Sequence, residues 1–275
     1  MKYVAVKGTQ VPALGLGTWQ LTGRACYDAV TAALELGYRH IDTADLYGNE
    51  AEIGKAVRDS GVDRDAVFIT TKVPPSKLAP EAAKRSAEDS LRRLGMDHVD
   101  LLLVHWPNPA APLGATLAAF AELREAGKAR HIGVSNFSVK LLTESVETHG
   151  ADLLANQVEY HPGLAQRPVL EATRRFGMML TAYAPLARGG VLRDAKIAAI
   201  ARKYGKTPAQ VTLRWLIEQD GVSAVPKATS RAHLAANIAI FDFALTPEDR
   251  AAIAALGGDD RIVDWPGYAP TWDPT

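Results

Sequence analysis

The sequence predicts an eight-stranded α/β barrel, and two observations lead to that fold class. Short runs rich in β-branched and apolar residues alternate with helical segments along the chain. The run at residues 101–104 is apolar throughout, which is typical of parallel strands that are covered on both faces. The expected strands are residues 14–18, 39–42, 67–72, 99–105, 129–135, 154–159, 178–183 and 223–226.

The spacing of four strand ends supports a repeated strand–helix unit. The ends at residues 42, 72, 105 and 135 lie 30, 33 and 30 residues apart, which matches the length of such a unit. Barrels of this kind often occupy about 250 residues as one domain. Residues 1–275 are therefore expected to form a single (β/α)8, or TIM, barrel domain.

Helix signals lie between the expected strands. One helix is expected at residues 24–36, because Gly37 follows as a natural C-terminal cap. A second is expected at residues 80–94, where a proline starts the first turn and a glycine follows the last. A third is expected at residues 247–256.

Both ends of the chain are expected to lie outside the repeated units. Residues 3–6 and 11–13, joined by residues 7–10, predict an N-terminal hairpin that closes the barrel floor. Residues 257–275 contain prolines, glycines and two tryptophans, which predicts a C-terminal loop. The aromatic residues of this loop either cover a pocket or pack on the surface.

Charge and composition exclude several classes of partner. Thirty-one basic residues balance 31 acidic ones, so no overall field attracts nucleic acid or an anionic membrane. The single cysteine, Cys26, allows neither an intramolecular disulfide nor a cysteine-based metal site, and we expect it to be packed in a helix. No metal site is predicted. The sequence has no signal-peptide pattern and no apolar run near about 18 residues, which predicts a cytoplasmic protein without a membrane span.

Four polar residues stand out because three end an expected strand and the fourth lies in the loop after one. They are Asp42, Tyr47, Lys72 and His105. In barrels the loops after the strands converge over one face, where active sites are built. Taken singly, each residue has a structural alternative: a cap, a solvated charge, a core histidine or a packed tyrosine.

Taken together, the four residues are suited to donating a proton to a substrate. A buried ion loses several kcal/mol of hydration, so Asp42 and Lys72 are expected to pair. The ammonium of Lys72 is expected to lower the pKa of the Tyr47 phenol from about 10, which makes Tyr47 a usable acid. His105 would hydrogen-bond the substrate oxygen. This chemistry suits carbonyl reduction.

Short motifs in the same order along nearly the whole chain are similar to those of the aldo-keto reductase family. A narrower similarity, from the compact loops and the residues after 260, is to small bacterial reductases of 2,5-diketo-D-gluconate and methylglyoxal. The motifs are GLGTW at 15–19, IDTA at 41–44, YGNE at 47–50, HWP at 105–107, GVSNF at 133–137, NQVE at 156–159, YAPL at 183–186, VPK at 225–227 and FDF at 241–243.

The resemblance implies an NAD(P)H-dependent reductase with Tyr47 as general acid, Lys72 and Asp42 as its support, and His105 orienting the carbonyl. It also implies that Ser135, Asn136 and Gln157 hold the nicotinamide carboxamide, for which their donors and acceptors are suited. Further residues implied in cofactor binding are Tyr183, which stacks on the nicotinamide ring, together with Thr18 and Leu186.

Cofactor choice is implied by the segment after residue 226. Lys227, Arg231, His233 and Asn237 fall where the family holds adenine and the 2′-phosphate, which implies NADPH. Three departures from the family pattern leave NADH open as a second cofactor: Ala228 in place of serine, His233 in place of arginine and Ala236 in place of glutamate. The glycines at 15 and 17 lack the third glycine of the dinucleotide-binding fingerprint.

Trp19, Trp106 and Trp265 are predicted to wall an apolar pocket for small aldehydes, dicarbonyls and aromatic aldehydes, although tryptophans there also serve as packing. Two other functions remain open. One is a cofactor-sensing subunit without turnover; the other is a lyase or aldolase in which Lys72 forms a Schiff base, against which Asp42 argues by keeping the amine protonated. From family habit, a monomer acting on a small carbonyl substrate is expected.

Overall fold

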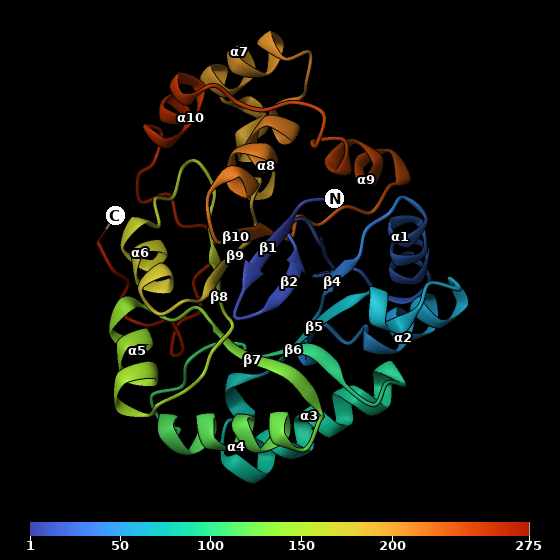
Figure 1. The fold of residues 1–275 in the computed structure, drawn as a ribbon, viewed down its shortest axis with the longest axis vertical. Helices are drawn as coiled ribbons and strands as arrows, with labels where there is room; N and C mark the ends of the chain where they lie inside the picture. Colours follow the sequence, from blue (N-terminus) through green and yellow to red (C-terminus); the bar gives the residue numbers. More distant parts are fainter. Residues whose placement is uncertain (275) are drawn as a thin grey trace.

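Eight parallel strands form one curled sheet in the computed structural model, which describes residues 1–274 (Figure 1). The strands follow one another in chain order across the sheet, so each pairs with its neighbour in sequence. All eight predicted strands are confirmed, with ends shifted by up to two residues. They are β3 (Leu16–Gly17), β4 (His40–Asp42), β5 (Phe68–Val73), β6 (Val99–Val104), β7 (Ala129–Ser135), β8 (Ala155–Glu159), β9 (Met179–Tyr183) and β10 (Val222–Ala224).

The first and last strands of the sheet are linked by backbone contacts. Parallel bridges join Leu14 to Ala224 and Gly17 to Lys227. The amide of Gly17 donates to Pro226 O over 3.0 Å. A Cβ at residue 17 would lie 2.5 Å from Val225 O, so only glycine allows this close approach.

Helices surround the strands as an outer ring (Figure 1). The helix at 80–94 has the predicted bounds, and Gly95 caps it with φ +64°. The helix predicted at 24–36 is shifted by one residue, and the one at 247–256 ends two residues early. The helices are α1 (Gly23–Glu35), α2 (Glu50–Asp59), α3 (Pro80–Leu94), α4 (Leu113–Glu125), α5 (Val139–Thr143), α6 (Arg167–Arg175), α7 (Ala195–Lys203), α8 (Pro208–Glu218), α9 (Arg231–Ile238) and α10 (Pro247–Ala254).

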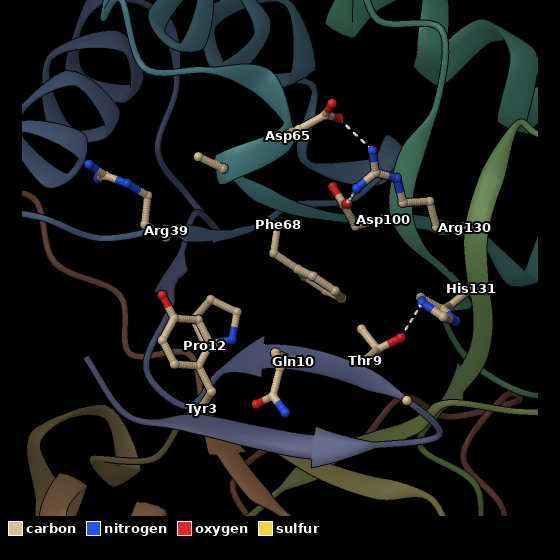
Figure 2. A pocket seen from close by; sticks show the side chains of 12 residues that line it. Tyr3, Thr9, Gln10, Pro12, Arg39, Asp65, Phe68, Asp100, Arg130 and His131 are labelled. Carbon is tan, nitrogen blue, oxygen red and sulfur yellow. Dashed lines mark hydrogen bonds and ion pairs between the residues drawn. The ribbon is translucent and has the colours of Figure 1, made fainter.

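The N-terminal hairpin covers the amino ends of the strands, as predicted. Strands β1 (Tyr3–Val6) and β2 (Thr9–Pro12) pair antiparallel. The predicted four-residue connection is wrong, because Lys7 and Gly8 both adopt positive φ and close a two-residue turn. Figure 2 shows the cavity of about 530 Å³ beneath the hairpin, where Thr9 Oγ1 lies 2.8 Å from His131 Nε2.

Two further predictions concern the tail and the cysteine. Residues 257–274 contain no helix or strand, which confirms the predicted loop over its described part. Cys26 is fully buried in α1, and burial raises the pKa of its thiol to about 12, which keeps it protonated. Within residues 1–274 no helix has the length and apolarity to cross a membrane, and no group of three His, Cys, Asp or Glu side chains could hold a metal ion.

Candidate active site

Asp42 and Lys72 form a buried ion pair at the carboxyl ends of β4 and β5, as predicted. Lys72 Nζ lies 2.7 Å from Asp42 Oδ1 and donates a second hydrogen bond to Thr43 O at 2.8 Å. The side chains of Asp42 and Lys72 are only 4% and 0% exposed. Burial lowers the pKa of Lys72, and the charge of Asp42 opposes that shift, so the carboxylate favours the charged form of the amine.

Tyr47 lies in a 3₁₀ turn at Asp45–Tyr47 rather than in an irregular loop. Asp45 anchors this turn, because its carboxylate accepts hydrogen bonds from Lys77, Ser86 and Arg93 at 2.6–3.0 Å. The sequence did not single out Asp45. Its position two residues before Tyr47 was the only signal that could have drawn attention to it.

The prediction that Lys72 lowers the pKa of Tyr47 is wrong. Burial raises that pKa, and the negative charge of Asp42 raises it further. The ammonium of Lys72 lies 5.1 Å from the centre of the Tyr47 ring, and within residues 1–274 the phenol hydroxyl makes no hydrogen bond to it. Burial and the charge of Asp42 outweigh the effect of Lys72 on the neutral phenol, which therefore stays protonated at neutral pH.

His105 stands next to Tyr47, with ring centres 5.7 Å apart in an edge-to-face arrangement. Burial lowers the pKa of His105 well below its ordinary value, and the charge of Lys72 acts in the same direction. The imidazole is therefore neutral at pH 7. Its buried Nδ1 has no hydrogen-bond partner among the described residues.

The residues predicted to hold a carboxamide form one hydrogen-bonded row along the carboxyl ends of β7, β8 and β9. Ser135 Oγ donates to Gln157 O at 2.7 Å, and Asn136 Nδ2 donates to Ser135 Oγ at 3.1 Å. Tyr183 OH, at the end of the row, donates to Asn136 Oδ1 at 2.7 Å. Asn136 has φ +63°, a conformation that asparagine tolerates better than most residues.

This row is joined directly to the ion pair and to the histidine. Gln157 Nε2 donates to Asp42 Oδ2 at 2.6 Å, and Asn136 Nδ2 donates to His105 O at 3.0 Å. The hydroxyl and amide groups suit a carboxamide, which needs both donors and acceptors. The structure therefore brings seven of the predicted residues into one network: Asp42, Lys72, His105, Ser135, Asn136, Gln157 and Tyr183.

Thr18 and Asn49 brace β4 from the opposite side. Thr18 is fully buried, and its hydroxyl donates to Asp42 O at 2.9 Å. Asn49 donates to Thr18 O at 2.9 Å and accepts from the Thr43 hydroxyl at 2.6 Å. No sequence pattern assigned a role to Asn49 alone, although it belongs to the YGNE motif at residues 47–50.

The residues predicted to bind phosphate and adenine lie apart from this network, at β10 and α9. Lys227, Arg231 and His233 are exposed, and Asn237 is buried. Arg231 forms an ion pair with Glu35 of α1, so the guanidinium that was predicted to bind phosphate already has a carboxylate partner. Leu186 is half-buried in the loop after β9.

The three predicted pocket tryptophans do not form one aromatic cluster. Trp106 packs edge-to-face against Trp265, with ring centres 6.0 Å apart. Trp272, which was not predicted, packs on Trp106 in the same way at 6.1 Å. Trp19 is 42% exposed and lies under Arg188, whose guanidinium is 4.9 Å from its ring centre. The tail thus supplies two of the three clustered indoles.

Comparison with known proteins identifies the family. The family model described as Aldo/keto reductase family matches residues 13–257. The chain belongs to the aldo/keto reductase family. It is 42% identical over 266 residues to the methylglyoxal reductase DkgB of Salmonella typhimurium, covering 96% of this chain and 99% of that protein. The chain is therefore an oxidoreductase, and the predicted family is confirmed.

Solved structures of other aldo/keto reductases have the same fold. A crystal structure provisionally named 2,5-diketo-D-gluconic acid reductase B is 46% identical, with a TM-score of 0.97 and coverage of 99% of this chain and 98% of that chain. An aldo-keto reductase from Bombyx mori, solved in complex with NADP, is 32% identical with a TM-score of 0.89, covering 98% of each chain. The relatives therefore match nearly the whole length of the chain and not only a part of it.

Proposed function

We propose that this protein reduces small aldehydes and ketones, with NADPH as hydride donor and Tyr47 as general acid. The proposal is supported above all by a continuous series of hydrogen bonds. The series runs from Lys72 through Asp42 and Gln157 to Ser135 and Asn136. Groups suited to proton transfer and groups suited to a carboxamide are thereby held by the same hydrogen bonds. Methylglyoxal and diketo-gluconate are the first substrates to test, because the similar proteins carry those names.

In this mechanism each residue has a separate task. When bound, the dinucleotide would supply the hydride that reduces the carbonyl carbon. Tyr47 donates its hydroxyl proton to the carbonyl oxygen, and the raised pKa keeps that proton available at neutral pH. Lys72, 5.1 Å from the Tyr47 ring centre, stabilises the negative charge left on the phenol, while neutral His105 donates an N–H to the substrate oxygen.

The cofactor site is proposed along the ends of β7, β8 and β9, with the carboxamide held by Ser135, Asn136 and Gln157. Tyr183 would stack on the nicotinamide ring, and Thr18 and Leu186 would line the site. Lys227, Arg231, His233 and Asn237 would hold the adenine and the 2′-phosphate, since exposed cations suit a phosphate. NADPH is therefore proposed over NADH.

Cofactor preference is tested with two variants of the same ion pair. Arg231→Ala should weaken NADPH binding about 10-fold or more and NADH binding little, because only NADPH carries the 2′-phosphate. Glu35→Gln frees Arg231 from its carboxylate and should tighten NADPH modestly. Dissociation constants from fluorescence titration measure both. Equal effects on the two cofactors would rule out a phosphate role for Arg231.

The alternative functions predict other outcomes. A Schiff base requires a neutral, accessible amine, whereas Lys72 is buried and paired with Asp42, so borohydride should trap no substrate on it. A cofactor sensor would bind NADPH without turnover. A panel of methylglyoxal, diketo-gluconate and aromatic aldehydes, measured with NADPH and with NADH, separates these cases, and trapped substrate or absent turnover would refute the reductase proposal.

Further predictions accompany this function. We propose that the sheet closes into a complete barrel, supported by the contacts of Leu14 and Gly17 with the segment after β10. A single domain over residues 1–275, a monomeric state and a cytoplasmic location stay predictions. Analytical ultracentrifugation tests the oligomeric state.

A further inference from the structure

The tail, residues 257–274, contains no helix or strand, so contacts with the rest of the protein must hold it in place. It nevertheless carries Trp265 and Trp272, both of which pack on Trp106, the residue after His105. Backbone hydrogen bonds to residues 163–165 hold residues 258–260, so the position of the indoles further along depends on the side chains that hold the rest of the tail.

Glu159, the last residue of β8, holds that backbone directly. Its Oε1 accepts from the Ile262 amide at 2.9 Å, and its Oε2 accepts from the Val263 amide at 2.8 Å. His161 Nε2 lies 2.9 Å from Oε1. The carboxylate is fully buried, and a buried carboxylate is stable only with such partners. Two adjacent N–H groups on one carboxylate define the register between the tail and β8.

The same strand face connects this contact to the proposed site. Gln157 and Glu159 are two residues apart on β8, so their side chains point to the same face. The Gln157 amide reaches Asp42, and the Glu159 carboxylate reaches the tail. One strand thus fixes the tail relative to the ion pair of Asp42 and Lys72.

Two further contacts extend the attachment. Asp273 Oδ2 accepts from the Val139 amide at 2.8 Å, three residues after Asn136. The Arg261 guanidinium lies 3.6 Å from the centre of the Trp272 ring. These contacts lie in exposed or half-buried surroundings, so the fully buried Glu159 is the anchor with the largest expected effect.

We propose that Glu159 is a positioning residue: its carboxylate fixes the tail, and the tail fixes the indoles that bound the carbonyl substrate. Glu159 contacts neither Tyr47 nor Lys72, so it acts on substrate binding and not on proton transfer. The inference rests on the proposed carbonyl reduction for its kinetic consequence, but its structural part can be tested without turnover.

The test variant is Glu159→Gln, which preserves size but replaces one acceptor oxygen with an NH₂ group facing a backbone N–H. We expect the KM for methylglyoxal to rise about 10-fold while kcat changes much less, and the NADPH dissociation constant to stay near the wild-type value. Trypsin should cleave after Arg261 about 10-fold faster, because the Arg261–Ile262 peptide bond that it cuts carries the Ile262 N–H that Glu159 holds. Mass spectrometry of the fragment 1–261 measures this rate.

Two other variants distinguish the loss of the Glu159 contact from a general folding defect. Val263→Pro removes the N–H that donates to Oε2 and leaves the buried carboxylate in place, so it should reproduce the KM increase and the faster cleavage. Asp100→Asn, a matched change of a buried carboxylate beneath the hairpin, should alter neither (Figure 2).

The outcomes separate the inference from the function it rests on. Unchanged cleavage after Arg261 in both tail variants would show that Glu159 does not hold the tail. Faster cleavage with an unchanged KM would show that the tail does not form the substrate pocket. If the wild-type protein reduces no carbonyl compound, the proposed function fails, and the cleavage rates still decide whether Glu159 is the anchor.

Discussion

At the amino ends of the strands Asp100 is buried beneath the hairpin, and at their carboxyl ends Asp42 is buried beside Lys72. Asp100 accepts from the Ile69 amide and pairs with Arg64 and Arg130, both of which reach solvent. Figure 2 shows its pair with Arg130. Figure 2 also shows Arg130 paired with Asp65. The buried charge of Asp100 therefore has two nearby counter-charges.

At the carboxyl ends of the strands, the buried lysine has fewer charged partners than Asp100 has. Lys72 is fully buried with Asp42 as its one ion-pair partner among residues 1–274. His105 Nδ1 is buried without a partner, and the Tyr47 hydroxyl makes no hydrogen bond within that part of the chain. Groups left short of partners in a packed protein are candidates for binding a ligand. Arg64 Nε and His98 Nε2 at the amino end also lack partners among the described residues, so the two ends differ chiefly in the buried lysine and the neutral histidine beside Tyr47, which support the proposed chemistry at the carboxyl end.

The largest effect is expected from removing the phenol hydroxyl. Tyr47→Phe should lower kcat for methylglyoxal reduction about 1000-fold, because it removes the hydroxyl that is proposed to donate the proton to the carbonyl oxygen. NADPH binding should be retained, which fluorescence titration checks. Activity within a few-fold of wild type would mean that another group donates the proton.

The next effect comes from removing the ammonium. Lys72→Met should lower kcat about 100-fold and also destabilise the protein by about 3 kcal/mol, because Asp42 would be left as an uncompensated buried charge. Steady-state kinetics and urea unfolding measure the two losses. A variant that lost stability but kept its kcat would make this ion pair structural, like the one at Asp100.

The smallest effect on activity is expected from pH. Burial lowers the pKa of His40 at the amino end and of His105 at the carboxyl end. Since the unfolded chain binds more protons, stability should fall as pH drops through about 6.5, by on the order of 1 kcal/mol per histidine per pH unit.

Activity should not follow stability over that range. Tyr47 stays protonated and His105 stays neutral, so kcat should vary by less than about 2-fold between pH 6 and 8. Kinetics and chemical unfolding in the same buffers check both curves. A kcat that falls with a midpoint near 6.5 would mean that His105 titrates during the reaction.

Much of this site could be predicted because it depends on strand ends. Asp42, Lys72 and His105 lie at the ends of runs whose apolar pattern is visible in the sequence, and parallel strands bring such ends together. Their pairing follows from the cost of burying a lone charge. The alternation of strands and helices also predicted every strand of the sheet and the helix at α3.

The rest depended on contacts between distant residues or on burial. The pKa of Tyr47 rises because neighbouring groups of the site bury its phenol and because Asp42 lies nearby, and the sequence specifies neither effect. Arg231 meets Glu35 across 196 residues, and Glu159 meets Val263 across 104. Trp272 joins Trp106 only because the tail folds back, which no pattern in the sequence indicates.

The most direct test compares Asp42→Asn with Asp100→Asn, the same substitution at the two ends of the strands. Each removes a buried negative charge beside cations, so both should lose stability by roughly 3 kcal/mol in urea unfolding. The account predicts that kcat/KM for methylglyoxal with NADPH falls at least about 100-fold in Asp42→Asn and stays within about 2-fold of wild type in Asp100→Asn. Equal losses of kcat/KM in the two variants, or none in Asp42→Asn, would contradict it.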